Sequence, residues 1–184
     1  MSRSPEVRLV DVDEPMLERL LELAQLDASA DDVTPPLGSG TGWNAERIDW
    51  FRAYHRSAAA GLDGPASEKS WAVLCGGSPA GSIRLKRTSP QASVPRTPEA
   101  ATLGSGEVET GIWLGRGYRS RGVGGAALVL VLAEARRAGL HQVVASTTAG
   151  NIGAQRLLTA AGGVLTHDDA GAVSAVVVLS TDSH

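Results

Sequence analysis

The segment from Gly115 to Leu128, GRGYRSRGVGGAAL, constrains the fold of this chain more than any other part of the sequence. It is rich in glycine and arginine, follows a predicted strand at Glu107 to Leu114, and leads into an apolar helix predicted from about Val123 to Ala138. Glycine lets the backbone approach a ligand without an intervening Cβ. A helix directs its free N–H groups and the positive end of its dipole into the preceding loop. The segment therefore predicts a site for a phosphate or pyrophosphate, to which Arg119 and Arg121 would add charge-assisted hydrogen bonds.

Strand-like and helix-like segments alternate along the rest of the chain. Alternating or short apolar runs predict strands at Val7 to Val12, Trp71 to Cys75, Gly81 to Arg87, Glu107 to Leu114, Gln142 to Thr147, Gly162 to Thr166 and Val173 to Leu179. Helices are predicted to start at Asp13 or Glu14 and at Asn44, and further ones to cover Val123 to Ala138 and Asn151 to Ala161. This order indicates a mixed α/β fold. The length of 184 residues suits one domain with a buried core, so we predict a single domain over residues 1–184.

Three segments between these elements are predicted as loops. Asp31 to Gly42 is rich in Asp, Pro and Gly, and Ala59 to Ser70 has a similar composition. Thr88 to Gly106 is too long for a minimal hairpin connection, which leaves a functional flap or a mobile loop as its two interpretations.

Composition excludes several classes of function. The formal net charge of -3, without a basic stripe, argues against a nucleic-acid binder. The single cysteine, Cys75, excludes an internal disulfide and a multi-cysteine metal site, and the scattered His55, His141 and His167 predict no metal. No apolar run is long enough to span a membrane, and the first residues lack the pattern of a signal peptide. We therefore expect a cytoplasmic protein that binds no membrane.

The loop could in principle bind a dinucleotide, because Gly122 to Ala127 fits the pattern G-x-G-x-x-A. That fingerprint requires a strand that runs straight into the first glycine and an acidic residue about twenty positions later. Here a long loop separates Leu114 from Gly122, and the strand Gln142 to Thr147 has no carboxylate. The dinucleotide interpretation does not fit. A glycine-rich turn before a core helix, with no ligand, is the remaining alternative for the loop taken alone.

Four motifs in order resemble the GNAT superfamily of N-acetyltransferases. Arg119 to Gly124 matches the acetyl-CoA signature R/Q-x-x-G-x-G/A, and Asn151 to Leu157 resembles the N-x-x-A/S-x-x-L helix. Glu109 to Leu114 and Gly139 to Val143 resemble the E-x-G-x-W-L and G-L-H-R-V stretches of the branch that includes ribosomal-protein N-terminal acetyltransferases. The resemblance implies a GNAT fold, with a mixed central sheet of about six to seven strands, splayed between the fourth and fifth, and about four helices.

The resemblance also implies an acetyl-CoA site, with acetyl-CoA as cosubstrate. Backbone groups of Trp113 and Leu114 would pair with the pantetheine arm, and Asn151 would hold it from the opposite strand. The pyrophosphate would be held beside Arg119 by the amides of the loop and first helical turn, namely Arg121, Gly122, Val123, Gly124, Gly125 and Ala126.

An amine must lose a proton before it attacks a thioester, because it is mostly protonated at neutral pH. Glu109 occupies the family position for the base, and Glu107, two residues earlier on the same strand face, is the reserve. Many family members carry a tyrosine as proton donor where this chain has Leu158. Ser146 and Thr147, at the end of the fifth predicted strand, are possible donors, but an ordinary strand position explains them better.

We therefore predict transfer of acetyl from acetyl-CoA to an amine. The acceptor could be a protein N-terminus, an aminoglycoside or peptide antibiotic, or a small metabolite, and Trp43, Trp50 and Tyr54 either belong to the core or line its pocket. The alternative, which Leu158 leaves open, is an acyl-CoA-binding module that has lost catalysis. Analogy with the superfamily adds the expectation of a homodimer.

Overall fold

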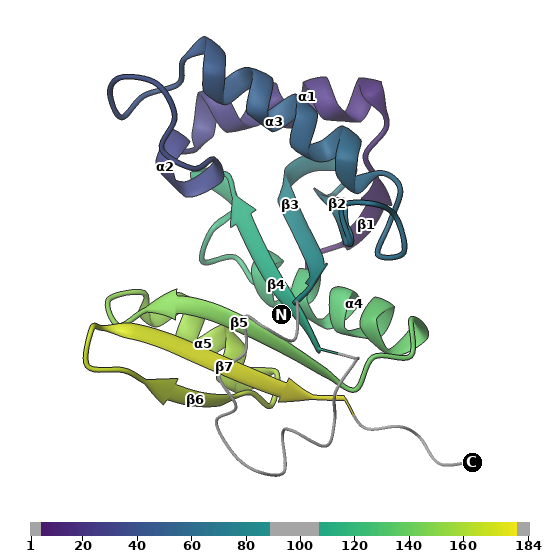
Figure 1. Cartoon of the computed structure of the whole chain (residues 1–184), viewed down its shortest axis with the longest axis vertical. Coiled ribbons are helices and arrows are strands. Elements are labelled where there is room, and N and C mark those ends of the chain that lie inside the picture. The colour runs from purple at the N-terminus through teal and green to yellow at the C-terminus, as the bar shows by residue number, and fades with distance from the viewer. Residues whose placement is uncertain (1–4, 89–106, 180–184) are drawn as a thin grey trace.

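The protein is built on one mixed sheet, seen in a computed structural model that describes residues 5–88 and 107–179 (Figure 1). Its seven strands lie in the order β1-β2-β3-β4-β5-β7-β6. Their bounds are β1 Val7–Asp11, β2 Glu68–Cys75, β3 Ser78–Arg87, β4 Glu107–Leu114, β5 Gln142–Thr148, β6 Val164–His167 and β7 Ala172–Val178. All neighbours are antiparallel except β4 and β5, which run parallel. The predicted mixed α/β sheet is confirmed.

Helices occupy both faces of this sheet. They are α1 Glu14–Asp27, α2 Ala30–Val33, α3 Ala45–Ala58, α4 Val123–Arg137 and α5 Ile152–Ala160, with a 3-10 turn, η2, at Arg116–Tyr118. Three of them begin where capping residues predict, because Asp13, Asn44 and Asn151 each accept the N–H of the residue three positions later. Local side-chain chemistry therefore determines these helix starts.

Each face of the sheet has its own apolar core. On one face, Val123 and Val131 of α4 and Leu158 of α5 pack against strand residues such as Ile83 and Val143. On the other face, α1 and α3 contribute the buried residues Leu17, Leu20, Leu21, Ala24 and Phe51, which pack against Ala72 of β2. Figure 1 shows α1 and α3 lying together over β2 and β3.

The sheet opens between β4 and β5. These strands pair only from Glu107 opposite Gln142 to Thr110 opposite Ala145. Beyond that point β4 stays paired with β3 as far as Leu114, and β5 stays paired with β7 as far as Thr148. The two strands diverge toward their carboxyl ends in Figure 1. The splay predicted between the fourth and fifth strands is confirmed.

The segment predicted as a loop from Asp31 to Gly42 begins inside a helical turn, α2. The reason lies elsewhere in the chain, in the fully buried Arg47 of α3. Its guanidinium donates to the Asp31 carboxylate at 2.7 Å, to the Thr34 hydroxyl at 3.3 Å and to the Leu37 carbonyl at 3.4 Å. A contact at this sequence distance leaves no local signal, so the prediction was wrong for α2.

Two strands are longer than predicted. β2 starts at Glu68, inside the predicted loop Ala59 to Ser70, because the buried Glu68 and Ser70 find hydrogen-bond partners on neighbouring elements. β3 starts at Ser78, which leaves only Gly76 and Gly77 in the turn, both with positive φ. Of the predicted loop Thr88 to Gly106, residues 89–106 lie outside the described residues, so neither interpretation of it is tested.

Candidate active site

The amino end of α4 lies at the open end of the sheet. Gly122 caps the helix with φ of 80°, a left-handed conformation that favours glycine. The Ala126 N–H already donates to the Gly122 carbonyl at 3.1 Å. The three preceding amides, those of Val123, Gly124 and Gly125, have no carbonyl a full turn earlier within the helix. These three amides are therefore free for a ligand, whereas the Ala126 amide, which was predicted with them, is already hydrogen-bonded within the helix.

The first turn of α4 packs between the end of β4 and helix α5. A Cβ placed on Gly124 would be 2.9 Å from Leu157 Cδ1 of α5 and 3.5 Å from Leu114 Cδ1 of β4. Position 124 therefore requires a glycine because side chains of β4 and α5 pack against it. A Cβ on Gly125 would meet nothing within 4 Å, so Gly125 is the glycine that keeps space open beside the helix end.

The two arginines of the loop are exposed and hydrogen-bonded to protein groups. Arg119 donates from Nε to the Leu114 carbonyl at 3.0 Å, and it forms an ion pair with Asp32 of α2 at 3.2 Å. Arg121 donates to the Gly117 carbonyl at 3.0 Å. Arg119 therefore connects the loop both to the end of β4 and to α2.

The remaining predicted coenzyme residues flank the open end of the sheet. Trp113 and Leu114 form the end of β4, beyond its last pair with β5. Asn151 follows β5 and is exposed, with its N–H donating to the Thr148 carbonyl at 3.0 Å and its Oδ1 capping α5. The structure thus brings these residues to the two sides of the same opening.

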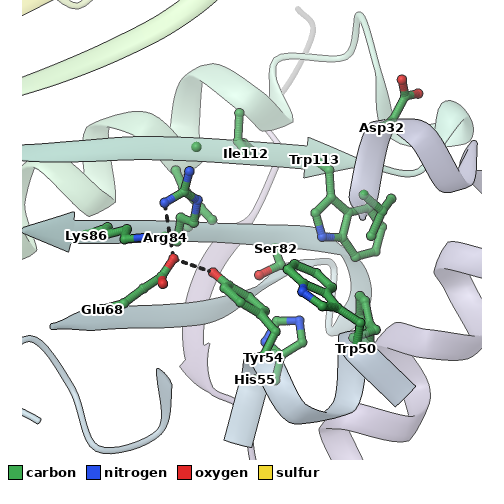
Figure 2. A pocket seen from close by; sticks show the side chains of 14 residues that line it. Asp32, Trp50, Tyr54, His55, Glu68, Ser82, Arg84, Lys86, Ile112 and Trp113 are labelled. Atoms are coloured by element: carbon green, nitrogen blue, oxygen red, sulfur yellow. Dashed lines mark hydrogen bonds and ion pairs between the residues drawn. The ribbon is translucent and has the colours of Figure 1, made fainter. Parts of the chain in front are cut away.

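A cavity of about 440 Å³ lies on the face that carries α1 and α3 (Figure 2). Gly111, Ile112 and Trp113 of β4 line it, and these are the first residues of β4 that no longer pair with β5. The cavity has two distinct ends in Figure 2. We call Glu68, Arg84 and Lys86 its polar end, and Trp50, Phe51 and Trp113 its aromatic end.

Arg84 is the central group of the polar end. Its Nη1 donates to Glu68 at 3.1 Å and its Nη2 donates to Glu109 at 2.7 Å. Strand register produces this bridge, because Arg84 lies opposite Gly111 while Lys86, one step along the same face, lies opposite both carboxylates. A Cβ on Gly111 would come within 3.0 Å of Arg84 Nε. The glycine therefore leaves the space in which the guanidinium lies.

Tyr54 of α3 completes the polar end. Its hydroxyl donates to Glu68 Oε1 at 3.0 Å, on the same oxygen that Arg84 binds (Figure 2). Burial raises the pKa of the Tyr54 phenol, and the nearby Glu68 carboxylate raises it further. Burial works to lower the pKa of Arg84, but Tyr54 and the two carboxylates outweigh it, so that the pKa is raised on balance. Tyr54 therefore stays a hydrogen-bond donor and Arg84 stays charged.

Aromatic rings line the cavity from Tyr54 at the polar end to Trp113 at the aromatic end. Trp50 and Tyr54, four residues apart on α3, stack with centroids 5.1 Å apart and planes 9° from parallel. Phe51 meets Trp113 of β4 edge to face at 6.3 Å. Trp43 lies outside the cavity lining and packs with the α1 and α3 core. Of the aromatic residues singled out in the sequence, two line the pocket and one belongs to the core.

His55 lies between this cavity and a smaller one lined by Asp11 and Lys69. Its Nδ1 is 3.0 Å from the Ser70 hydroxyl, and its Nε2 is buried with no hydrogen-bond partner among the described residues. Burial lowers the pKa of His55 to about 4. The ring is therefore neutral near pH 7.

The predicted base, Glu109, lies at the edge of the polar end. It shares a strand face with Gly111 and Trp113, its side chain is 37% exposed, and Arg84 binds it. The reserve carboxylate, Glu107, instead accepts from Gln142 Nε2 at 2.9 Å. Leu158 is buried in the core cluster beneath the sheet.

Sequence reasoning missed Glu68 and Arg84 as site residues. Glu68 lies in the segment predicted as a loop, Ala59 to Ser70. Arg84 lies in the predicted strand Gly81 to Arg87, where no motif distinguishes it. One signal was present: Ser82, Arg84 and Lys86 place three polar side chains on one face of a strand, a face that helices would normally cover with apolar contacts. Such a face indicates a cavity between the sheet and its helices.

Within residues 5–88 and 107–179, no group of three or more His, Cys, Asp or Glu side chains gathers as a metal site requires. In the same part of the chain, no helix is both long and apolar enough to cross a membrane.

Comparison with known proteins gives the family. The model of the acetyltransferase (GNAT) domain matches residues 17–164. Among curated proteins, none matches this sequence.

Three solved structures illustrate the shared fold. The GNAT domain of S. lividans PAT has a TM-score of 0.67 at 20% identity, covering 95% of this chain and 90% of that one. RimL, a ribosomal L7/L12 alpha-N-protein acetyltransferase in complex with coenzyme A, has a TM-score of 0.68 at 13% identity, with 94% of each chain covered. Campylobacter jejuni N-acetyltransferase PseH, in complex with acetyl coenzyme A, has a TM-score of 0.59 at 12% identity, covering 95% of this chain and all of that one (100%). The predicted GNAT fold is confirmed.

Proposed function

This chain belongs to the acetyltransferase (GNAT) domain family, and from that premise we propose that it transfers an acetyl group from acetyl-CoA to an amine. One observation carries the proposal. The end of β4, from Gly111 to Leu114, has two neighbours. Leu114 packs against the first turn of α4, whose amides are free, and Gly111, Ile112 and Trp113 line the cavity. A donor bound at one side and an acceptor bound at the other would meet at this strand.

The coenzyme residues follow from this arrangement. The amides of Val123, Gly124 and Gly125 hold the pyrophosphate at the α4 dipole, with Gly122 supplying the left-handed turn. Arg119 and Arg121 add positive charge beside them. Backbone groups of Trp113 and Leu114 and the Asn151 amide hold the pantetheine arm. The RimL and PseH structures, which contain coenzyme A and acetyl coenzyme A, support this choice of ligand.

The residues around the site fit such a ligand. Gly125 leaves open space where a side chain would enter the cradle, and Gly122 adopts a conformation that an L side chain would strain. Bound acetyl-CoA supplies a thioester, whose C–S bond breaks as the C–N bond to the amine forms, giving an amide and the free thiol of coenzyme A.

Glu109 is the proposed base. It takes a proton from the acceptor ammonium, directly or through one water, so that the amine can attack as a neutral nucleophile. Arg84 fixes the position of its carboxylate and keeps it beside Gly111. Leu158 cannot donate a proton and lies in the core, so no protein proton donor is assigned.

Two assays separate this enzyme from a binding module. Isothermal titration calorimetry measures coenzyme A binding, and colorimetric thiol detection measures coenzyme A release over a panel of primary amines. We expect saturable binding and amine-dependent release. Binding without release on any amine would instead identify a module that retains the loop and has lost catalysis.

A further inference from the structure

Most charged groups at the polar end of the cavity are already bound to one another. Arg84 directs one terminal nitrogen at Glu68 and the other at Glu109, and its Nε lies against Gly111. Tyr54 gives its proton to Glu68. The donors of Arg84 and Tyr54 are therefore already committed to carboxylates, and a ligand carboxylate or phosphate would have to displace one of these bonds in order to use them. Lys86, whose side chain is exposed, is the other cation of the polar end.

Glu68 has acceptor capacity left for a ligand. Its side chain is only 10% exposed, yet it lines the cavity. Both of its hydrogen bonds to the described residues fall on Oε1, which leaves Oε2 without a partner among them. An ammonium group satisfies such a carboxylate with a charge-assisted hydrogen bond. The polar end therefore fits a primary ammonium head group.

The aromatic end places different demands on the body of the ligand. Trp50 and Trp113 offer ring surface, with the buried Phe51 behind Trp113, and Val33 and Ile112 add aliphatic surface. A flat apolar group packs well against such rings. The polar groups near these rings are Ser82 and Asp32, and the Asp32 carboxylate is already paired with Arg119. The several hydroxyls or additional ammonium groups of a sugar or polyamine would therefore find few free partners there. The volume of about 440 Å³ lies within the usual range for small-molecule pockets.

We propose that the acceptor is a small primary amine on a flat apolar body, an arylalkylamine, with its ammonium bound by Glu68 and its ring packed against Trp50 and Trp113. This inference rests on the proposed acetyl transfer. It assigns Glu68 as the group that binds the head of the acceptor, beside Glu109 as the base on the other side of Arg84. It also selects a small molecule over a protein N-terminus or an aminoglycoside.

Substrate preference is the first test. The catalytic efficiency of acetyl transfer is measured by thiol release with phenethylamine, tryptamine, n-butylamine, spermidine, kanamycin and a short peptide with a free N-terminus. We expect the two arylalkylamines to exceed n-butylamine by at least about tenfold, because only they bury a ring. The highest efficiency on spermidine, kanamycin or the peptide would overturn this inference and leave acetyl transfer standing. No release with any amine would overturn both.

Glu68→Gln tests the head group. It should raise the KM for phenethylamine about tenfold or more, because a charged hydrogen bond is lost. It should leave the KM for acetyl-CoA and the inhibition constant of phenethyl alcohol, a neutral isostere, unchanged. The exposed Glu22 of α1 provides the matched control, Glu22→Gln, which should change none of these constants. Equal weakening of the amine and the alcohol would mean a structural role for Glu68 and would overturn its assignment.

Trp50→Leu tests the body of the acceptor. It should bring the catalytic efficiency with phenethylamine close to that with n-butylamine, while n-butylamine turnover itself is maintained. Since both substrates are compared in the same variant, partial loss of folded protein cancels from the ratio. An unchanged ratio would remove Trp50 from the acceptor site.

Discussion

At the scale of single residues, Arg84 organises the candidate site. One guanidinium binds carboxylates from β2 and β4 and lies over a glycine that leaves it room. Neither carboxylate is left as an unpaired charge near the cavity, which lowers the cost of placing both there. The same bridge holds Glu109, the proposed base, and Glu68, the proposed binding group for the acceptor ammonium, on opposite sides of the Arg84 guanidinium.

Glu109→Gln should lower kcat by about a hundredfold near pH 7, because the amide cannot accept a proton from the ammonium. The affinity for coenzyme A should stay the same, since Glu109 lies away from the α4 amino end. Steady-state kinetics and calorimetry measure the two quantities. Glu107→Gln serves as the control, because its carboxylate binds Gln142 instead of a cavity residue. Unchanged kcat in Glu109→Gln across the pH range would refute the assignment, and loss in Glu107→Gln alone would transfer the role.

His55 should make the fold sensitive to acid. Burial lowers its pKa from 6.5 to about 4, so the unfolded chain takes up the proton first as the pH falls. The stabilisation is complete above pH 6.5 and is lost as the pH falls toward 4. Urea denaturation at pH 7 and pH 5 should show the wild type losing about 2 kcal/mol more unfolding free energy than His55→Gln. Equal losses in the two proteins would contradict a buried neutral histidine.

At the scale of elements, the open end of β4 has two roles. Its first half pairs with β5 and belongs to a continuous sheet, whereas its second half pairs only with β3. The unpaired edge from Gly111 to Trp113 offers backbone groups to an extended ligand, as an edge strand does, whereas the Leu114 carbonyl already accepts from Arg119. The first turn of α4 closes the opening from one side by packing between Leu114 and Leu157.

Two neighbouring glycines of α4 should respond differently to substitution. Gly125→Val adds a side chain where nothing lies within 4 Å, so the fold should persist while coenzyme A affinity falls by at least about tenfold. Gly124→Ala places a Cβ 2.9 Å from the Leu157 side chain and should instead lower the unfolding free energy by about 1 kcal/mol. Calorimetry and urea denaturation of both variants measure these effects. Full coenzyme A affinity in Gly125→Val would contradict a pyrophosphate site at the amino end of α4.

Elements with local signals were predictable from the sequence. Asp13, Asn44 and Asn151 cap their helices within three residues, and the β4 and loop motifs indicated the splayed sheet. Elements that depend on distant partners were not predictable. α2 depends on Arg47, thirteen or more positions away, and the start of β2 depends on Tyr54 and Arg84. The acceptor side of the site is built mainly from such long-range contacts, which is why Glu68 was missed.

At the scale of the whole molecule, the sheet separates two binding tasks. In the proposed function, the glycine-rich loop and α4 bind the coenzyme and the cavity under α3 binds the acceptor, with β4 common to both. Arg119 links the two sides through Asp32, which also lines the cavity. A reaction between two ligands is faster when both are bound next to the same strand, because binding holds the reacting atoms close together.

The central claim is that acetyl moves from acetyl-CoA to an amine in this site. The direct measurement uses acetyl-CoA labelled in the acetyl group, with phenethylamine and n-butylamine as acceptors, and follows the label by mass spectrometry. We expect labelled amide and free coenzyme A in equal amounts, with slower formation in Glu109→Gln. Label found only in acetate, or retained on coenzyme A with both amines, would contradict it.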